Sequence, residues 1–111
     1  MTKRIPENAW AAELHRFTSR NAGRTTKLEL DTPDFGALSQ ELGFPLRGIA
    51  YDARAERVLI TLGDQGASDR HLTHTIQHAD AIFVLVDVRG RDEAMAISHH
   101  NSQTLLRFLD L

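Results

Sequence analysis

The sequence predicts an α+β fold in which an N-terminal amphipathic helix packs on a mainly antiparallel sheet of about six strands, a sheet that can curl into a half-barrel. One segment near the start carries apolar residues at helical spacing, whereas the remainder alternates strand-forming segments with short turns typical of hairpins. With 111 residues, of which 41% are hydrophobic and 25% charged, the composition is that of an ordered globular chain. We therefore expect residues 1–111 to form a single domain.

The helix is predicted within the segment IPENAWAAELHRFTSRNAG. Trp10, Leu14 and Phe17 recur at i, i+4 and i+7, so they share one face of a helix, and the charged side chains fall outside that face. Pro6 suits the first helical position, and Gly23 supplies a stop signal. Because an apolar stripe at this spacing normally faces the core, we interpret it as a packing surface rather than as a ligand-binding box.

Strands are predicted next along the chain. Residues 25–32 alternate between two faces, one of them charged, which is the pattern of a half-buried strand. The segment 33–43 combines apolar spacing that suits a short helix with Gly36, which favours a loop, and we expect it to be irregular or briefly helical. Residues 45–52 and 57–63 flank the short linker ARAE and predict a hairpin.

The second half of the chain also has strand character. Residues 81–88 contain a continuous apolar run of strand formers, which is typical of a strand covered on both faces. Residues 94–100 and 104–111 predict a second hairpin around Asn101 and Ser102. We find no internal repeat, linker or low-complexity segment.

Three of the six histidines lie in the stretch DRHLTHTIQH, residues 69–78, at spacings of three and four. On a helix these spacings would stack His71, His74 and His78 on one face, as some metalloenzymes present their ligands. The β-branched residues between them instead favour an extended segment. In a strand His74 and His78 lie about 13 Å apart and His71 points the opposite way, so the three cannot share one zinc ion at a bond length of about 2.0 to 2.1 Å.

We interpret His74 as a structural residue. In the extended segment it shares a face with Leu72 and Ile76, and two apolar neighbours indicate that this face points at the core. A buried histidine is normally neutral and hydrogen-bonded, because buried polar side chains nearly always have a partner.

Few residues are candidates for a functional site. The chain has no cysteine, which excludes disulfides, thiolate nucleophiles and the common structural zinc sites. No nucleophile elbow, phosphate-binding glycine loop, acid–base pair or triad is present in the sequence, so we predict no catalytic residue, no metal and no cofactor. The candidate ligand-binding residues are His74, His99 and Asp64. The alternative is a His/Asp metal-dependent enzyme that combines His74 with Asp64, Asp69 or His99.

Positive charge is concentrated at the start of the chain. Residues 1–27 hold six Lys or Arg against two acids, although the net charge of the whole chain is −2. This segment suggests a third function, nucleic-acid binding, which would require Arg16, Arg20, Arg24 and Lys27 to share one exposed face. Six positive charges without interleaved aromatic residues offer few phosphate contacts, so we expect no nucleic-acid partner.

The segments PLRGIAYDARAERVLITLGD, HLTHTI and TLLRF follow one another in this order, after a helix that opens on IPENAW. Together they resemble a family of short bacterial proteins known only as a domain of unknown function, and the similarity spans nearly the whole chain. The proline that often follows the LTHTI segment in that family is replaced here by QHAD. The resemblance implies no activity, ligand or catalytic residue, and His74 is the one histidine that belongs to the shared pattern.

The leading hypothesis is a small non-enzymatic cytoplasmic module that binds a partner protein or a small ligand, because no catalytic set can be assembled from the sequence. The longest apolar run, Ala81–Val86, is much shorter than the roughly 20 residues that cross a bilayer. The N-terminal residues do not have the apolar stretch of a secretory signal, so we expect the cytoplasm as compartment.

Overall fold

The computed structural model describes residues 1–34, 36–63 and 71–110, which are called the described residues below. Their elements are β1 (Thr2–Ile5), a 3-10 turn η1 (Glu7–Ala9), α1 (Trp10–Asn21), β2 (Thr25–Thr32), β3 (Gly36–Asp52), β4 (Arg57–Gly63), β5 (His71–Gln77), β6 (Ala81–Val86), β7 (Asp92–His99) and β8 (Ser102–Phe108). The strands form one sheet in the order β1-β6-β7-β8-β2-β3-β4-β5, and all neighbouring pairs are antiparallel. The predicted α+β class is confirmed, but the sheet has eight strands within this part of the chain rather than about six.

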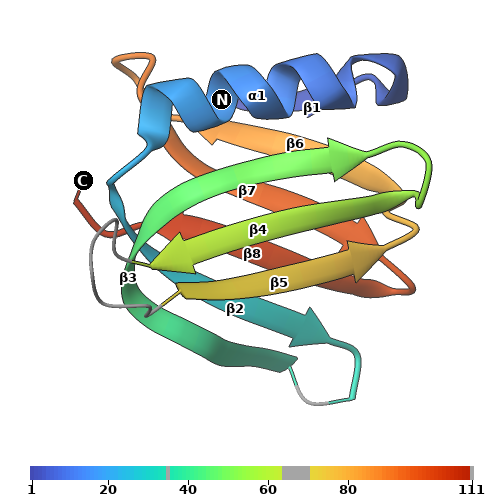
Figure 1. Cartoon of the computed structure of the whole chain (residues 1–111). Coiled ribbons are helices and arrows are strands. Elements are labelled where there is room, and N and C mark those ends of the chain that lie inside the picture. The colour runs from blue at the N-terminus through green and yellow to red at the C-terminus, as the bar shows by residue number, and fades with distance from the viewer. Residues whose placement is uncertain (35, 64–70, 111) are drawn as a thin grey trace.

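Strand β3 folds the sheet over on itself (Figure 1). Its residues up to Pro45 pair with β2, and its residues from Leu46 onward pair with β4. As a result β4 and β5 lie in front of the strands β6, β7 and β8, while α1 lies along the top of the molecule. The sheet is not closed, because β1 and β5 stand at opposite ends of the strand order.

The predicted face of α1 packs into the core enclosed by the curled sheet. Trp10, Leu14 and Phe17 have exposed fractions of 3%, 0% and 0%. The Phe17 ring stacks on Phe108 at a centroid distance of 5.8 Å, and the Trp10 Nε1–H donates to the Ile5 carbonyl oxygen at 3.0 Å. The predicted packing role is therefore confirmed. Within the described residues no helix is long and apolar enough to cross a membrane.

The prediction for residues 33–43 was wrong. Strand β3 begins at Gly36 and runs without interruption into the segment that was predicted to start at residue 45. The first part of β3 forms a hairpin with β2, from Gly36 opposite Thr32 onward, with irregular register at two points. Pairing with β2 gives this segment its backbone hydrogen bonds, so long-range context decides its conformation against a weak local pattern.

Two further differences concern β1 and β6. Residues Thr2–Ile5, which carry no strand pattern of their own, pair along their whole length with β6. The expectation that β6 is covered on both faces was also wrong, because Phe83 and Leu85 are only half-buried. The single helix packs on the inner face of the sheet, and the outer face of β6 is covered only in part, for example by the Arg4 guanidinium over the Phe83 ring.

Candidate functional site

The predicted extended conformation around His74 is confirmed. Strand β5 pairs with β4 in an unbroken register that places His74 opposite Ile60, on the face that carries the fully buried side chain of Ile60. His71 lies on the opposite face. The expected burial is only partly met: Ile76 is 3% exposed, but His74 is half-buried, and its side chain makes no hydrogen bond with the rest of the described chain.

His99, the last residue of β7, faces the same interior space as His74. Its Nε2 lies 2.8 Å from the hydroxyl oxygen of the buried Thr104. Burial lowers the pKa of His99, the charges of His100 and His74 lower it further, and Asp80 opposes them. The structure thus brings two of the three sequence candidates, His74 and His99, close enough to interact electrostatically.

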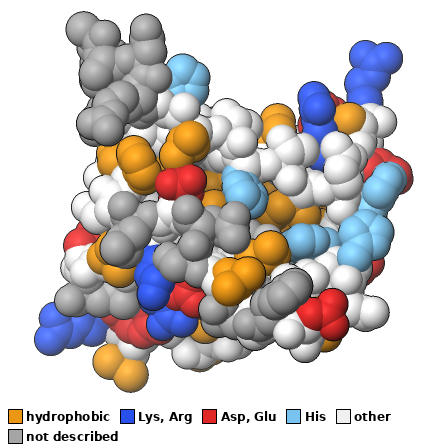
Figure 2. All heavy atoms as spheres, turned by 90° about the horizontal axis from the view of Figure 1, so that it is seen from below, with side chains coloured by type: hydrophobic (Ala, Val, Ile, Leu, Met, Phe, Trp, Pro, Cys, Tyr) orange, Lys and Arg blue, Asp and Glu red, His pale blue; other side chains and the backbone are white. Residues whose placement is uncertain are grey.

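The third candidate, Asp64, lies outside the described residues, as does Asp69. Sequence reasoning missed Asp80, which is close to His99 only because the β5–β6 connection returns beside the end of β7, where the Asp80 N–H donates to the Ser98 carbonyl oxygen at 2.7 Å. Figure 2 shows several histidine side chains on the lower face of the molecule, next to apolar side chains.

A polar cleft of about 520 Å³ adjoins His99. Asp31, Asp80, Ser98 and Ser102 are among its lining residues. Hydroxyl, carboxylate and imidazole groups in one cleft can bind a polar ligand. Among the described residues, however, no group of three His, Cys, Asp or Glu side chains is placed to hold a metal ion.

The lowered pKa of His99 predicts a loss of stability in acid. Because the unfolded chain protonates this imidazole at higher pH than the folded chain, the stability that the neutral form supports is present above about pH 6.5 and decreases as the pH falls below that value. We expect His99→Gln to lose less stability than the wild type between pH 7 and pH 5, as measured by urea midpoints. His15→Gln, an exposed change on α1, is the control and should follow the wild type. Equal losses in all three proteins would contradict the role of His99.

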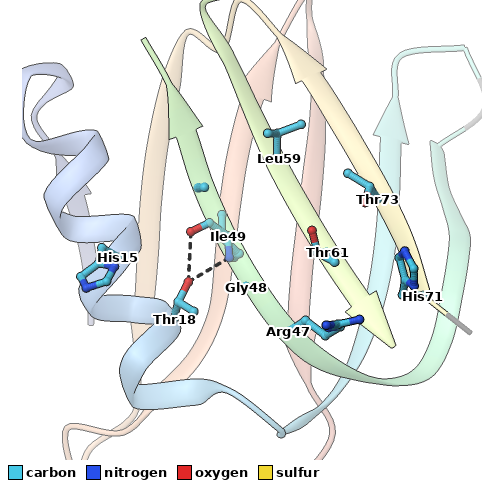
Figure 3. A pocket seen from close by; sticks show the side chains of 10 residues that line it. His15, Thr18, Arg47, Gly48, Ile49, Leu59, Thr61, His71 and Thr73 are labelled. Carbon is cyan, nitrogen blue, oxygen red and sulfur yellow. Dashed lines mark hydrogen bonds between the residues drawn. The ribbon is translucent and has the colours of Figure 1, made fainter. Parts of the chain in front are cut away.

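A second cleft, of about 600 Å³, lies between α1 and the outer face of β3, β4 and β5 (Figure 3). It is lined by His15, Thr18, Arg47, Gly48, Ile49, Ala50, Leu59, Thr61, His71 and Thr73. Thr18 links α1 to β3 through two hydrogen bonds. Its hydroxyl donates to the Ile49 carbonyl oxygen at 3.0 Å and accepts from the Ile49 N–H at 2.8 Å. This contact holds one wall of the cleft in place.

Arg47 is placed by a β-bulge. In the β3–β4 register Leu46 pairs with Leu62 and Gly48 pairs with Thr61, so Arg47 is the extra residue. Bulges re-aim side chains and are common beside functional sites. In Figure 3 the Arg47 side chain reaches across the end of β4 toward the His71 side. An isolated glycine inside a strand pattern, as in PLRG, is a sequence signal for such a bulge.

The polar groups of this face converge around the end of β4. Thr61 and Thr73 are direct partners in the β4–β5 register, so their side chains are neighbours on the outer face. Figure 3 shows Arg47, Thr61 and His71 at the same end of the three strands, whereas His15 lies apart from them on α1. We call Arg47, Thr61, His71 and Thr73 the Arg47 group.

Arg47 is the one arginine among the described residues that line this cleft. None of the described residues that line it carries a carboxylate. Arg47 also forms no ion pair with any residue in the described ranges, whereas Arg57, at the other end of β4, lies 3.4 Å from Asp52. The Arg47 group therefore offers hydrogen-bond donors with no carboxylate among the described lining residues.

The basic N-terminal segment is arranged differently. Arg16 pairs with Glu13, Arg20 with Asp92, Arg24 with Asp110 and Lys27 with Glu29. The Arg24 side chain is only 11% exposed and lies over the Phe108 ring at 3.9 Å. These four residues do not present one face of unpaired cations, which is the arrangement that nucleic-acid binding would need.

Comparison with known proteins identifies the family of the chain. A family model described as a family of unknown function, DUF5335, matches residues 1–110. The chain belongs to this family. No curated protein and no solved structure matches. The resemblance to a family of unknown function is thereby confirmed, and membership of DUF5335 assigns no activity to the chain.

Proposed function

We propose that this DUF5335 protein is a small non-enzymatic binding module whose ligand carries an anionic group, a phosphate or a carboxylate, held by the Arg47 group. The observation that carries this proposal is an arginine presented by a bulge, with no ion pair among the described residues, in a cleft whose described lining has no carboxylate.

The chemistry of the group suits an oxyanion. The planar guanidinium of Arg47 provides paired N–H donors that match phosphate and carboxylate oxygens. Thr61 and Thr73 each add a hydroxyl donor, and the His71 ring has at least one N–H donor in either protonation state. The β4–β5 ladder holds three of these four side chains on a rigid surface, so little ordering is needed when a ligand binds.

The alternatives have less support. A metal-dependent enzyme would need a ligand set, and no such set is placed among the described residues. Nucleic-acid binding would need a wider surface of unpaired cations. We also propose that the protein works in the cytoplasm.

Titration with inorganic phosphate and citrate, followed by NMR amide shifts, tests the proposal. We expect shifts centred on residues 47, 61, 71 and 73. Arg47→Ala should weaken binding about tenfold or more, because a hydrogen bond to a charged group contributes roughly 1.5 to 3 kcal/mol and each 1.4 kcal/mol is a factor of ten.

The matched control is Arg54→Ala, which removes another exposed arginine in the turn after β3. It should bind as the wild type does. Shifts spread over many arginines, or equal affinity in Arg47→Ala and Arg54→Ala, would reject this site.

A further inference from the structure

The free edge of β5 is unusual among the edges of this sheet. β5 stands at one end of the strand order and pairs only with β4 within the described residues. Figure 1 shows no strand on its outer side. Natural sheets protect exposed edges with short strands, charged side chains, prolines or bulges. The opposite edge follows this rule, because β1 has four residues, includes Lys3 and Arg4 and is followed by Pro6.

β5 has none of these protective features. It is seven residues long, its register with β4 is uninterrupted, and HLTHTIQ contains no Lys, Arg, Asp, Glu or Pro. Thr73 and Thr75 are exposed. A long, regular edge without charge is a template for pairing with another strand.

The direction of the unpaired backbone groups can be derived from the ladder. The His78 N–H donates to the Glu56 carbonyl oxygen at 2.9 Å, which continues the β4–β5 pairing by one step beyond Arg57 and Gln77. Backbone groups in an antiparallel pair alternate between the two sides of a strand. Since the backbone groups of His78 point toward β4, those of His74 do so too. The backbone N–H and C=O groups of Thr73 and Thr75 therefore point to the free edge.

The sequence of β5 is nearly symmetric about His74, with Thr73 and Thr75 on either side and Leu72 and Ile76 beyond them. We propose that β5 pairs antiparallel with β5 of a second copy of this chain, about a two-fold axis that passes beside His74. In this register Thr73 lies opposite Thr75 of the second copy, and both present the backbone groups that the β4 ladder leaves unused. The hydrogen-bond pattern and the side-chain symmetry thus select the same axis.

Two kinds of side-chain pair in this register favour the contact. Thr73 and Thr75 of the second copy meet on the outer face, where cross-strand threonine pairs contribute to sheet stability. Leu72 and Ile76 of the second copy meet on the inner face. Leu72 is 40% exposed in the single chain, so the second copy covers apolar surface that this sheet leaves open.

A second copy fits better than an unrelated strand because of this symmetry. A two-fold interface requires each surface to be complementary to itself, and a near-palindromic strand has that property. A different peptide would need no symmetry in β5. The interface shares Thr73 with the proposed anion site, whereas Arg47 and Thr61 lie on β3 and β4, away from the pairing edge, and Thr75 belongs to the interface alone.

Light scattering coupled to size-exclusion chromatography, over a range of loading concentrations, tests the proposal. The wild-type mass should rise with concentration toward twice the 12.4 kDa of the chain. Thr75→Pro removes an N–H that faces the free edge, so it should abolish the dimer without breaking a β4–β5 hydrogen bond. Thr75→Ala keeps that N–H and should still dimerise.

A second variant tests the same interface in case Thr75→Pro does not fold. Thr73→Lys combined with Thr75→Lys places like charges directly opposite each other across the axis and should also give a monomer. Circular dichroism confirms that each variant is folded. A wild type that stays monomeric at every concentration overturns the proposal, and so does a dimer that persists in both variants. A monomer whose β5 amides shift on adding a separate strand-forming peptide assigns the edge to another chain and also overturns it.

Discussion

Replacing Phe17 by Ala is expected to reduce the free energy of unfolding by about 3 to 5 kcal/mol, because a fully buried aromatic side chain loses its burial and leaves a cavity. Phe17 is 0% exposed and stacks on Phe108, which joins α1 to the last strand of the sheet. A domain of this size has a total stability of roughly 5 to 15 kcal/mol, so the change should lower Tm by on the order of 10 to 20 °C.

The matched control for this prediction is Arg16→Ala, which lies next to Phe17 on the exposed side of the same helix and, among the described residues, forms an ion pair only with Glu13. It should change the stability by less than about 1 kcal/mol, as exposed ion pairs usually do. Phe17→Leu should fall between the two, since it keeps most of the apolar volume. An unchanged Tm in Phe17→Ala would mean that α1 does not depend on this contact.

The elements that sequence reasoning found are those whose pattern is local. Trp10, Leu14 and Phe17 determine one face of a helix by spacing alone, and the turn residues near Asn101 mark a hairpin without reference to the rest of the chain. β1 and the first part of β3 could not be found in this way, because pairing with β6 and β2 supplies their hydrogen bonds.

The candidate site residues also differ in whether a local sequence pattern could reveal them. That His74 is extended and faces inward follows from the alternation of a strand, but its proximity to His99 depends on how the curled sheet brings β5 near the end of β7. The Arg47 group was missed because its four members come from three strands. The glycine after Arg47, inside a strand-forming segment, is the sequence signal for a bulge there.

A second large effect is expected at the end of α1, where Asp92 is buried. Its Oδ2 accepts hydrogen bonds from Asn21 Nδ2 at 2.7 Å and from Arg20 Nε at 2.9 Å. Asn21 is 2% exposed, and its Oδ1 accepts from Arg24 at 2.7 Å, so these side chains form one network that links the helix to β7.

We expect Asp92→Ala to cost roughly 2 to 3 kcal/mol in urea unfolding, because the buried Asn21 amide loses a charged acceptor. The loss should not be larger, since Arg20 is 50% exposed and water can solvate its charge when the carboxylate is removed. Glu13→Ala is the matched control: it removes the same charge from a carboxylate that is 38% exposed and pairs with the exposed Arg16, and it should cost less than about 1 kcal/mol.

A double-mutant cycle separates this hydrogen bond from a general charge effect. If the Asn21–Asp92 contact carries the loss, then Asn21→Ala combined with Asp92→Ala should cost less than the two single changes added together, because both remove the same bond. Additive losses, or an equal loss in Glu13→Ala, would assign the effect to net charge instead. The network would then stabilise the chain through long-range electrostatics rather than through the Asn21–Asp92 hydrogen bond.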